Sequence, residues 1–395
     1  MKKILFMVST MNLGGVEKSL LSLLSAMPKE KYEISVLLLF KNGDLLKLLP
    51  DWIKLEEAEW FQNIRPIVMQ PPRKTIEDYY SSRKYISIFL FIFMYTVSKL
   101  FNNRYYFYKY VFRKVPCNHN KYDVAIAYQG PTDIIDFYIA NKVNAPKKFS
   151  WVHFDVSKFK INRKLYKRLY KKFDRIFAVS KTAKEKLIDF IPDVKSKIEV
   201  FSNIVPNNEI SIAADEDIAF DSTFKGIKLV TVARLSEEKG PDIAVKTFSR
   251  LIRDGFQVKW YWIGEGSYRE KVQKLIKEYG VEDRFLLMRA VLNPYPYILK
   301  SDIYIQTSKQ EGYCITIAEA KCLRKPIVST YFTGVEEQII HGQNGYITAC
   351  DDIELYNGIK FMIENPEIRN RLVENLNLHL KETVSEVNKL TDLID

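Results

Sequence analysis

The 395-residue chain has few residues of the kinds that hold structural metals or form disulfide frameworks. Its four histidines show no ligand spacing, and its four cysteines are scattered without a close pair: Cys117, Cys314, Cys322 and Cys350. Zinc sites and disulfide scaffolds both depend on a regular spacing of such residues. We therefore expect no structural metal, and a reducing, cytoplasmic compartment is the simplest setting for unpaired thiols.

Long apolar runs are also missing. The apolar run at residues 4–8 is too short for a secretory signal and is followed by a Gly-Gly turn at residues 14–15. The uncharged run at residues 85–97 has thirteen residues, whereas a helix that spans a bilayer needs ~20. The sequence therefore predicts neither a signal peptide nor a membrane-spanning helix.

Short apolar stretches alternate with helical patterns along the chain. In the first half the predicted strands are residues 4–8, 34–40, 122–128, 148–152, 173–180 and 198–201. In the second half they are residues 228–233, 258–263, 284–288, 303–306 and 326–329. This alternation is typical of the α/β class, with parallel sheets covered on both faces and ligands at the carboxyl ends of the strands.

The length of the chain and the restart of the alternation predict two Rossmann-like, doubly wound domains. The first spans residues 1–205 and the second spans residues 226–377. Between them, residues 206–225 are acidic and rich in turn formers, so we expect a linker there. A C-terminal helix at about 378–395 is expected to pack back on the first domain.

Positive charge is concentrated in the first half of the chain. Residues 61–120 hold ten Lys and Arg against two Asp and Glu, and residues 142–172 hold eleven against one. No helix-turn-helix, zinc-finger or RNA-binding sheet motif accompanies this charge, so we expect no nucleic-acid partner. Residues 85–97 form either an interfacial helix on an anionic membrane or a buried helix beside a solvated basic face, and both interpretations stay open.

Two carboxylates near the predicted strand 303–306 are the strongest candidates for a site. Glu311 is followed by glycine, and Glu319 lies eight residues later in a helix-forming stretch. A helix that begins near Cys314, Ile315 and Thr316 would aim free backbone N–H groups at an anion, while the carboxylates suit sugar hydroxyls. The alternative is a surface acid followed by an ordinary helix.

Two cations and a glycine-rich turn follow the first strands of the second half. Arg234 and Lys239 come after the strand at 228–233, where a diphosphate would need them, although solvated loop cations are the alternative. Gly264, Glu265 and Gly266 follow the strand at 258–263 and suit a nucleotide base or ribose.

The first half offers weaker candidates. Gly14 and Gly15 follow the first strand, where missing side chains let backbone approach a ligand, but such a pair is more often just a turn. His153 follows the strand at 148–152 and either contacts substrate or is a structural ring with a hydrogen-bonded nitrogen.

Taken in order, these motifs resemble family 4 of the retaining, two-Rossmann-domain (GT-B) glycosyltransferases. The motifs are Gly14-Gly15-Val16-Glu17, RLSEEKG at 234–240, Gly264-Glu265-Gly266, and Glu311-Gly312 with Glu319-Ala320. The resemblance covers essentially the whole chain and implies two domains that face a central cleft. There are departures: Arg324 and Ala290 stand where the family has glycine, and Lys321 where it has an apolar residue.

The resemblance implies a role for each candidate residue. Those matching Arg234 and Lys239 bind the diphosphate of a nucleotide-sugar, Glu311 contacts the donor sugar, and Glu319 holds the ribose. The remaining roles are a phosphate site at the amides of Cys314, Ile315 and Thr316, a nucleotide contact at Gly264 and Glu265, a closing loop at Gly14 and Gly15, and a position near the sugar and acceptor for His153.

The expected function is therefore retaining hexosyl transfer from a nucleotide-sugar, in particular a UDP-sugar, without a metal cofactor. The expected acceptor is a lipid-linked or polymeric glycan at the inner face of the membrane, as in polysaccharide, capsule or glycolipid biosynthesis. Two alternatives stay open: a nucleotide-sugar epimerase or hydrolase of the same architecture, and a catalytically silent scaffold for another glycosyltransferase.

Overall fold

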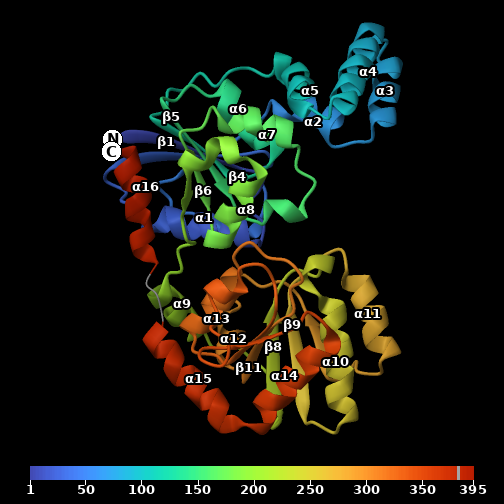
Figure 1. Cartoon of the computed structure of the whole chain (residues 1–395), viewed down its shortest axis with the longest axis vertical. Helices are drawn as coiled ribbons and strands as arrows, with labels where there is room; N and C mark the ends of the chain where they lie inside the picture. The colour runs from blue at the N-terminus through green and yellow to red at the C-terminus, as the bar shows by residue number, and fades with distance from the viewer. Residues whose placement is uncertain (380–382) are drawn as a thin grey trace. The chain divides into compact units, whose positions relative to one another are not determined.

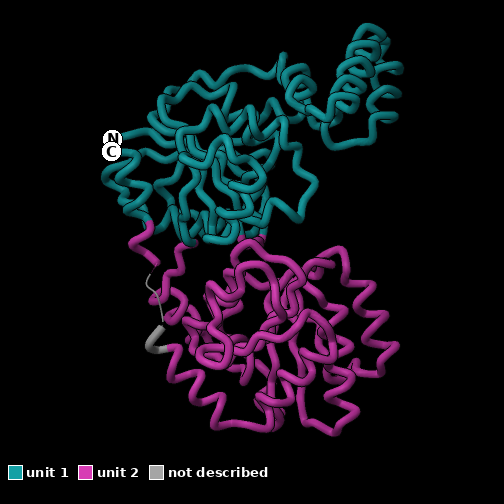
Figure 2. Tube along the Cα trace, viewed as in Figure 1, with its two compact units in different colours: residues 1–12, 16–202, 387–395 teal, residues 13–15, 203–386 magenta. Residues whose placement is uncertain are grey.

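The computed structural model describes residues 1–379 and 383–395, and the side chains of all of these except 377–379. The chain divides into two compact units (Figure 2). The first unit comprises Met1–Asn12, Val16–Ser202 and Val387–Asp395, and the second comprises Leu13–Gly15 and Asn203–Glu386. Each unit is built around one parallel sheet.

The first unit holds a seven-stranded sheet in the order β3-β2-β1-β4-β5-β6-β7 (Figure 1). Its strands are β1 (Lys2–Val8), β2 (Tyr32–Leu38), β3 (Lys54–Glu57), β4 (Val124–Gly130), β5 (Lys147–Val152), β6 (Arg175–Ala178) and β7 (Ile198–Val200). Its helices are α1 (Gly15–Ala26), α2 (Phe61–Val68), α3 (Pro72–Ser81), α4 (Tyr85–Leu100), α5 (Arg104–Val111), α6 (Asp133–Lys142), α7 (Arg163–Tyr170), α8 (Lys181–Phe190) and α16 (Val387–Ile394).

The second unit holds a six-stranded sheet in the order β10-β9-β8-β11-β12-β13. Its strands are β8 (Ile227–Val232), β9 (Val258–Ile263), β10 (Phe285–Met288), β11 (Ile303–Gln306), β12 (Ile327–Thr330) and β13 (Tyr346–Thr348). Its helices are α9 (Asn207–Ala214), α10 (Pro241–Arg253), α11 (Arg269–Glu278), α12 (Tyr295–Leu299), α13 (Ile315–Cys322), α14 (Asp352–Glu364) and α15 (Pro366–His379).

Both faces of the second sheet are buried, which explains why its strands are mostly apolar. Along β9, Trp260 and Trp262 enter a core with α10, α11 and α14, whereas Tyr261 and Ile263 enter a separate core with α9, α12 and α13. Successive strand residues point to opposite faces, so a strand covered on both sides is apolar at every position. The prediction of doubly wound α/β domains is confirmed.

Residues 206–225, for which the sequence predicts a linker, are instead packed into the second unit. Ile210 and Ala214 form one face of α9 and are buried in the core shared with α12 and α13. Phe220 stacks edge-on against Tyr261, with 4.5 Å between the ring centroids. The acidic and turn-forming residues around this short apolar pattern predict a loop. The helix is stabilised by burial of its apolar face against the sheet.

The chain's last helix belongs to the first unit. Leu390 and Ile394 of α16 are fully buried, and Lys2 and Lys147 donate hydrogen bonds to the carbonyl oxygens of Ile394 (2.6 Å) and Leu393 (2.8 Å). These lysines satisfy backbone acceptors that have no partner inside the last turn of a helix. Residues 380–382, within the segment where the sequence predicts this helix to begin, lie outside the described residues.

The uncharged run at 85–97 is part of α4, which packs beside α3 away from the sheet of the first unit (Figure 1). Only Phe91 and Ser98 of this helix are buried, so it is not the buried core helix of the second interpretation. Among the described residues, none of the helices is both long and apolar enough to cross a bilayer.

Candidate functional site

The candidate residues of the second unit lie where its strand order reverses. β8 is the first strand of this unit and pairs with β9 on one side and β11 on the other. The loops after β8, β9 and β11 therefore leave the sheet at the same edge, and they carry Arg234, Gly264 and Glu311. In open parallel sheets this reversal creates a crevice at the carboxyl ends of the strands, where ligands bind.

Lys239 and Glu311 form the centre of this region. The Lys239 Nζ lies 2.5 Å from Glu311 Oε1, and the two side chains are 17% and 11% exposed. Burial favours the neutral amine, but the adjacent carboxylate outweighs it and raises the pKa of Lys239 above its ordinary value. Lys239 is therefore a protonated amine, and the contact with Glu311 holds it at a fixed position.

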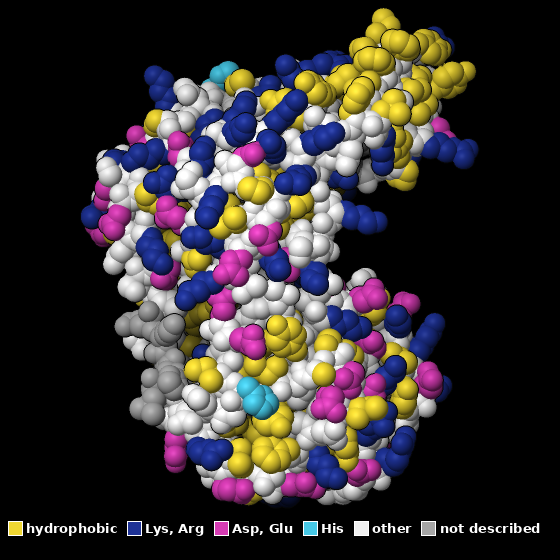
Figure 3. Space-filling model, viewed as in Figure 1, with side chains coloured by type: hydrophobic (Ala, Val, Ile, Leu, Met, Phe, Trp, Pro, Cys, Tyr) yellow, Lys and Arg dark blue, Asp and Glu magenta, His cyan; other side chains and the backbone are white. Residues whose placement is uncertain are grey.

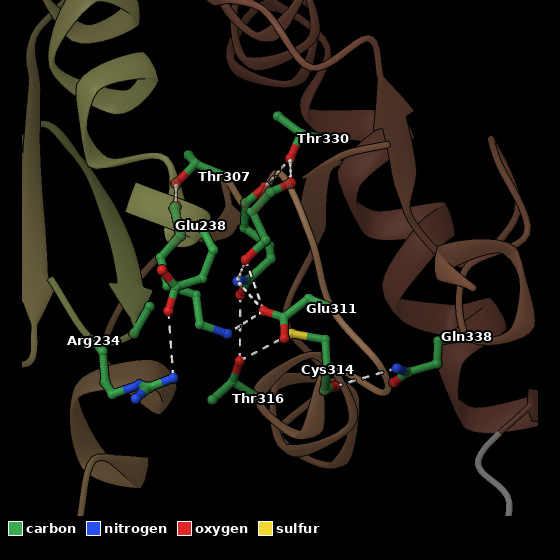
Figure 4. A network of polar contacts seen from close by, with 12 residues as sticks. Arg234, Glu238, Thr307, Glu311, Cys314, Thr316, Thr330 and Gln338 are labelled. Carbon is green, nitrogen blue, oxygen red and sulfur yellow. Dashed lines mark hydrogen bonds and ion pairs between the residues drawn. The ribbon is translucent and has the colours of Figure 1, made fainter. Parts of the chain in front are cut away.

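Gln306, the last residue of β11, organises the side chains around this pair. Its Nε2 donates to Ser308 Oγ (2.7 Å), while its Oε1 accepts from Thr316 Oγ1 (3.3 Å). Ser308 Oγ in turn donates to Glu311 Oε1 at 2.7 Å. We call Lys239, Gln306, Ser308, Glu311 and Thr316 the Lys239–Glu311 cluster; Figure 4 shows the polar contacts around it.

The bonds to Glu311 leave one side of its carboxylate open. Within the described part of the chain, the contacts from Lys239, Ser308 and Gln306 all reach Oε1. Oε2 accepts none of these bonds, so it keeps lone pairs that can receive a hydroxyl proton. The carboxylate is thus oriented by the protein and still able to bind a ligand.

The helix predicted to begin near Cys314 is α13, and Cys314 is its N-cap residue. Cys314 is buried, and burial raises the pKa of its thiol to about 12, so the sulfur is a neutral SH group. The Cys314 carbonyl accepts from Gln338 Nε2 at 3.2 Å. The first N–H groups of a helix have no intrahelical acceptor, which leaves those of Ile315 and Thr316 available to an anion.

Glycines let the three loops approach each other closely. A side chain at Gly264, which has φ of 154°, would place its Cβ 2.0 Å from the Ala233 carbonyl oxygen. The Leu235 N–H donates to the Glu265 carbonyl at 3.0 Å, so the segments carrying Arg234 and Glu265 are joined through backbone. Gly240 has the same role against Thr307, because its Cβ would meet that carbonyl oxygen at 2.1 Å.

Arg234 differs from Lys239 in its surroundings. Its guanidinium lies 3.4 Å from Glu238 Oε1, and its side chain is 63% exposed. A solvated pair of this kind contributes little to stability. Arg234 is therefore a largely solvated cation at the edge of the cluster (Figure 4), whereas the contact with Glu311 holds Lys239 at its centre.

Glu319 lies one turn into α13 and is only 2% exposed. Tyr295 OH donates to its Oε1 at 3.0 Å. Glu311 precedes α13 and contacts Lys239, whereas Glu319 lies within α13 and contacts Tyr295. The expected division into two roles is compatible with this arrangement and stays a prediction.

The candidates of the first half of the chain lie on other elements. Gly14 lies in the turn that follows β1, and Gly15 is the first residue of α1. His153 follows β5, and its Nε2 lies 2.8 Å from the Tyr128 carbonyl oxygen. Burial lowers the pKa of His153 to about 4, so the ring is neutral, donates through Nε2 and keeps Nδ1 as an acceptor. This geometry supplies the structural ring and also an acceptor nitrogen.

One departure from the family pattern has a direct structural counterpart. Arg324 follows α13 with φ of 54°, the left-handed conformation that glycine adopts most readily. The Lys325 N–H donates to the Ala320 carbonyl at 3.1 Å, as expected where a helix ends in this conformation. The turn after α13 therefore forms with arginine in place of glycine.

Several residues of the site were not predicted from the sequence: Gln306, Ser308, Thr330, Gln338 and Tyr295. Thr330, at the end of β12, donates to the Ser308 carbonyl at 2.7 Å and fixes the loop that carries Glu311. Polar residues at the carboxyl ends of two neighbouring strands are the signal that would have identified Gln306 and Thr330. Gln338 and Tyr295 carry no such signal, because they reach the site from distant segments.

Comparison with known proteins identifies the second unit. Residues 215–378 match the family described as glycosyl transferases group 1. The chain contains a group 1 glycosyltransferase domain. This domain includes the Lys239–Glu311 cluster, Arg234, Gly264 and the whole of α13.

Two relatives from Campylobacter jejuni act on undecaprenol-linked glycans by name. The chain is 28% identical to an N-acetylgalactosamine-N,N'-diacetylbacillosaminyl-diphospho-undecaprenol 4-alpha-N-acetylgalactosaminyltransferase, over 53% of this chain and 56% of that protein. It is 24% identical to a GalNAc-alpha-(1->4)-GalNAc-alpha-(1->3)-diNAcBac-PP-undecaprenol alpha-1,4-N-acetyl-D-galactosaminyltransferase, over 97% of this chain and 94% of that protein. The chain thus spans about half the length of the first relative and nearly all of the second.

Among solved structures, the crystal structure of HepE from Anabaena in complex with UDP-glucose has a TM-score of 0.71. The two chains are 16% identical, and the match covers 100% of this chain and 99% of the other. At this sequence identity, the structural similarity is evidence for the fold alone. Together with the two parallel sheets, it confirms the predicted GT-B fold.

Proposed function

We propose that the protein is a retaining glycosyltransferase that moves a hexosyl group from a UDP-sugar to a lipid-linked glycan acceptor. The observation that carries the proposal is the Lys239–Glu311 cluster at the reversal of strand order, inside a group 1 glycosyltransferase domain. A fixed cation, a carboxylate with an open oxygen and the start of a helix lie together there. These groups match the diphosphate and the sugar of one donor molecule.

The diphosphate is assigned to Lys239, Arg234 and the first N–H groups of α13. Negative charge grows on this group as the sugar–phosphate bond breaks, so fixed positive charge stabilises the transition state more than the ground state. Lys239 is already oriented by Glu311, and Arg234 is exposed enough to move onto the phosphates. These cations do the work of a metal in our proposal, so the reaction needs no divalent ion.

The sugar is assigned to Glu311 Oε2. We propose that this oxygen accepts a hydrogen bond from a hydroxyl group of the donor sugar and so orients the ring. Because Oε1 is bonded to Lys239 and Ser308, Glu311 is a poor candidate for a covalent nucleophile. Two carboxylates do not by themselves imply a glycosyl-enzyme intermediate. We propose that the acceptor attacks from the face that the diphosphate leaves, and that a phosphate oxygen takes the acceptor's proton.

The remaining assignments are Glu319 with Gly264 and Glu265 at the nucleoside, and Gly14, Gly15 and His153 on the side of the sugar and acceptor. His153 Nδ1 is suited to accept a hydrogen bond from a hydroxyl group, because Nε2 donates to the Tyr128 carbonyl oxygen. The alpha linkages in the names of the two Campylobacter jejuni relatives support retention, and the UDP-glucose complex of HepE supports a UDP donor.

The acceptor side of the proposal rests on the first unit. Both relatives act on undecaprenol-linked glycans by name, and the exposed apolar residues of α4 are suited to a membrane surface. We propose a peripheral protein at the cytoplasmic face of a membrane, in the biosynthesis of a polysaccharide, including capsule, or of a glycolipid. The basic residues around α4 would contact anionic lipids.

Calorimetry with a panel of nucleotides and nucleotide-sugars tests the donor site. We expect UDP to bind, and Lys239→Ala to weaken binding on the order of 10-fold or more because a buried charge-assisted contact is lost. Lys309→Ala is the matched control, because Lys309 lies on the loop after β11 that carries Glu311 but pairs with Asp242 of α10 at 2.9 Å, outside the cluster. Equal losses in both variants, or no binding of any nucleotide-sugar by the wild type, would contradict the assignment.

The reaction is tested by incubating the protein with UDP-sugars and a pool of lipid-linked acceptors. We expect transfer that depends on the acceptor and survives chelation of divalent ions, with the anomeric configuration of the donor kept in the product by NMR. Turnover of the UDP-sugar without acceptor would instead favour an epimerase or hydrolase. Nucleotide binding without any turnover would favour a silent scaffold.

A further inference from the structure

A pocket of about 440 Å³ lies in the first unit, between α2 and the helices α3 to α5. Aromatic and basic side chains line it, including Trp60, Tyr79, Lys84, Tyr110, Arg113 and Lys114. The pocket shares no residue with the candidate site of the second unit. Its volume is in the range of pockets that bind small molecules.

Three cations converge on this pocket from two segments. Lys84 immediately precedes α4, whereas Arg113 and Lys114 belong to the short 3-10 helix Phe112–Lys114 that follows α5. The Arg113 guanidinium lies 3.9 Å from the centroid of the Tyr110 ring, and Tyr110 OH donates to the Ser87 carbonyl of α4 at 3.4 Å. The aromatic ring thus holds one cation at the wall and connects the two segments.

These cations are not neutralised by nearby acids. Residues 61–120 contain only two carboxylates, Glu77 and Asp78. Glu77 pairs with Arg73 at 3.0 Å, and Asp78 accepts from Gln70 Nε2 at 2.8 Å. Within the described residues, no ion pair is formed by Lys84, Arg113 or Lys114. The pocket therefore has an excess positive charge that an anion can balance.

The helix beside the pocket presents an apolar surface to solvent. Ile86, Phe89 and Phe93 of α4 are 79%, 70% and 54% exposed, and Tyr85 and Leu100 are also exposed. Figure 3 shows hydrophobic side chains gathered over α3 and α4, with Lys and Arg along the neighbouring surface. Soluble proteins rarely expose such a patch without a partner. The partner must combine an anionic group with apolar chains.

We propose that this pocket binds the phosphate head group of an anionic phospholipid of the bilayer, while the exposed face of α4 lies among the acyl chains. The inference rests on the proposed peripheral membrane function and gives it a specific lipid site. Cations near a membrane surface attract anionic lipids, and amphipathic helices bury their apolar face at the level of the head groups. The discrete pocket adds selectivity that a diffuse basic surface lacks.

Vesicle flotation tests the pocket. We expect the wild-type protein to float with phosphatidylglycerol vesicles at low salt and not with phosphatidylcholine vesicles. The triple variant Lys84→Gln, Arg113→Gln, Lys114→Gln should bind on the order of 100-fold more weakly, since each cation near the surface contributes about fivefold. Its matched control removes three exposed cations of the same unit, Lys29→Gln, Lys41→Gln and Lys195→Gln. An equal loss of vesicle binding in the control variant would contradict the assignment of lipid binding to the pocket.

A soluble lipid separates the head-group site from membrane binding. Dihexanoylphosphatidylglycerol below its micellar concentration should change the fluorescence of Trp60, and Trp60→Phe should remove that change while keeping vesicle binding. Binding of the soluble lipid without flotation would contradict membrane association. Flotation without binding of the soluble lipid would contradict head-group binding in the pocket. Tenfold tighter binding of farnesyl diphosphate would overturn the choice of a bilayer phospholipid in favour of a lipid-linked acceptor.

The same variants keep this inference separate from the donor site. Calorimetry with UDP should give the same affinity for the wild type and the triple variant, because the pocket and the Lys239–Glu311 cluster lie in different units. Loss of UDP binding in the triple variant would overturn a role confined to lipid. Absence of UDP binding in the wild type would contradict the proposed donor site and leave the flotation result unaffected.

Discussion

At the scale of single residues, the Lys239–Glu311 pair is the centre of the donor site that we propose. Glu311 contacts Lys239 and Ser308 through one carboxylate oxygen, and in our proposal the other oxygen binds the donor sugar. Removing one partner of a buried pair leaves the other charge uncompensated, at a cost of about 3–5 kcal/mol. The two charges therefore depend on each other for stability as well as for ligand binding.

The two carboxylates of the site should separate in a binding and activity experiment. Glu311→Gln should lower transfer on the order of 100-fold while UDP binding is kept, because Lys239 is freed for the diphosphate. Glu319→Ala should instead weaken UDP by about 10-fold, through the loss of a charged hydrogen-bond acceptor for the ribose. Calorimetry with UDP and a transfer assay measure the two effects, and equal loss of UDP affinity in both variants would contradict the division.

Asp136, buried in α6 of the first unit, should make stability depend on pH. Burial raises the pKa of Asp136 to about 7. Hydrogen bonds from Ser150, Thr132 and Tyr166 lower the pKa, but burial has the larger effect. The folded protein then keeps a proton that the unfolded chain loses above pH 4, so stability should fall as pH rises from about 4 to 7. A shift of this size corresponds to at most about 4 kcal/mol.

Urea unfolding of the wild type and Asp136→Asn at a series of pH values measures this effect. The asparagine variant keeps the shape and an acceptor oxygen for the Thr132 N–H, but it cannot ionise. We expect the slope of the free energy of unfolding between pH 4 and 7 to be smaller in the variant. Identical slopes would show that Asp136 titrates normally.

At the scale of elements, the positions of strands and loops followed from local patterns. Buried parallel strands are continuous apolar runs, so β8, β9 and β11 were predicted from sequence almost to the residue. The start of α13 was also predicted, because the pattern around Cys314 favours a helix after a loop. β3 and β13 were missed: β3 is a charged edge strand and β13 has only three residues.

The turn after α13 offers a stability test at this scale. Arg324 holds φ of 54°, which costs a residue with a side chain roughly 1 kcal/mol relative to glycine. Arg324→Gly should therefore raise the free energy of unfolding of the second unit by about 0.5–1 kcal/mol, as followed by denaturant unfolding. Arg324→Ala, which keeps a Cβ, is the control and should not stabilise; equal stabilisation by both would point to the arginine charge instead.

At the scale of the whole molecule, the chain returns at its end to the unit in which it began. Leu390 and Ile394 of α16 are fully buried in the first unit, and Tyr32 OH lies 3.2 Å from Asp395 Oδ1. The first unit is therefore assembled from segments nearly 400 residues apart in sequence.

Truncating one side chain of α16 should destabilise the first unit selectively. Leu390→Ala should cost about 2–5 kcal/mol, as for other fully buried leucines. Hydrogen exchange should then be faster in β1 and β2, with β8 and β9 unchanged. Asn388→Ala, at an exposed position of the same helix, is the control and should change stability by less than about 0.5 kcal/mol. Faster exchange in both units would show that α16 supports the whole chain.

The sequence by itself determined the α/β class, the two-domain organisation and the loops that carry Arg234, Lys239 and Glu311, because periodicity and loop position are local properties of the chain. Only the tertiary structure decided the partners of those residues. The Lys239–Glu311 bond and the burial of α16 join residues far apart in sequence. Such contacts depend on strand order and on which faces are covered, and no local pattern encodes either.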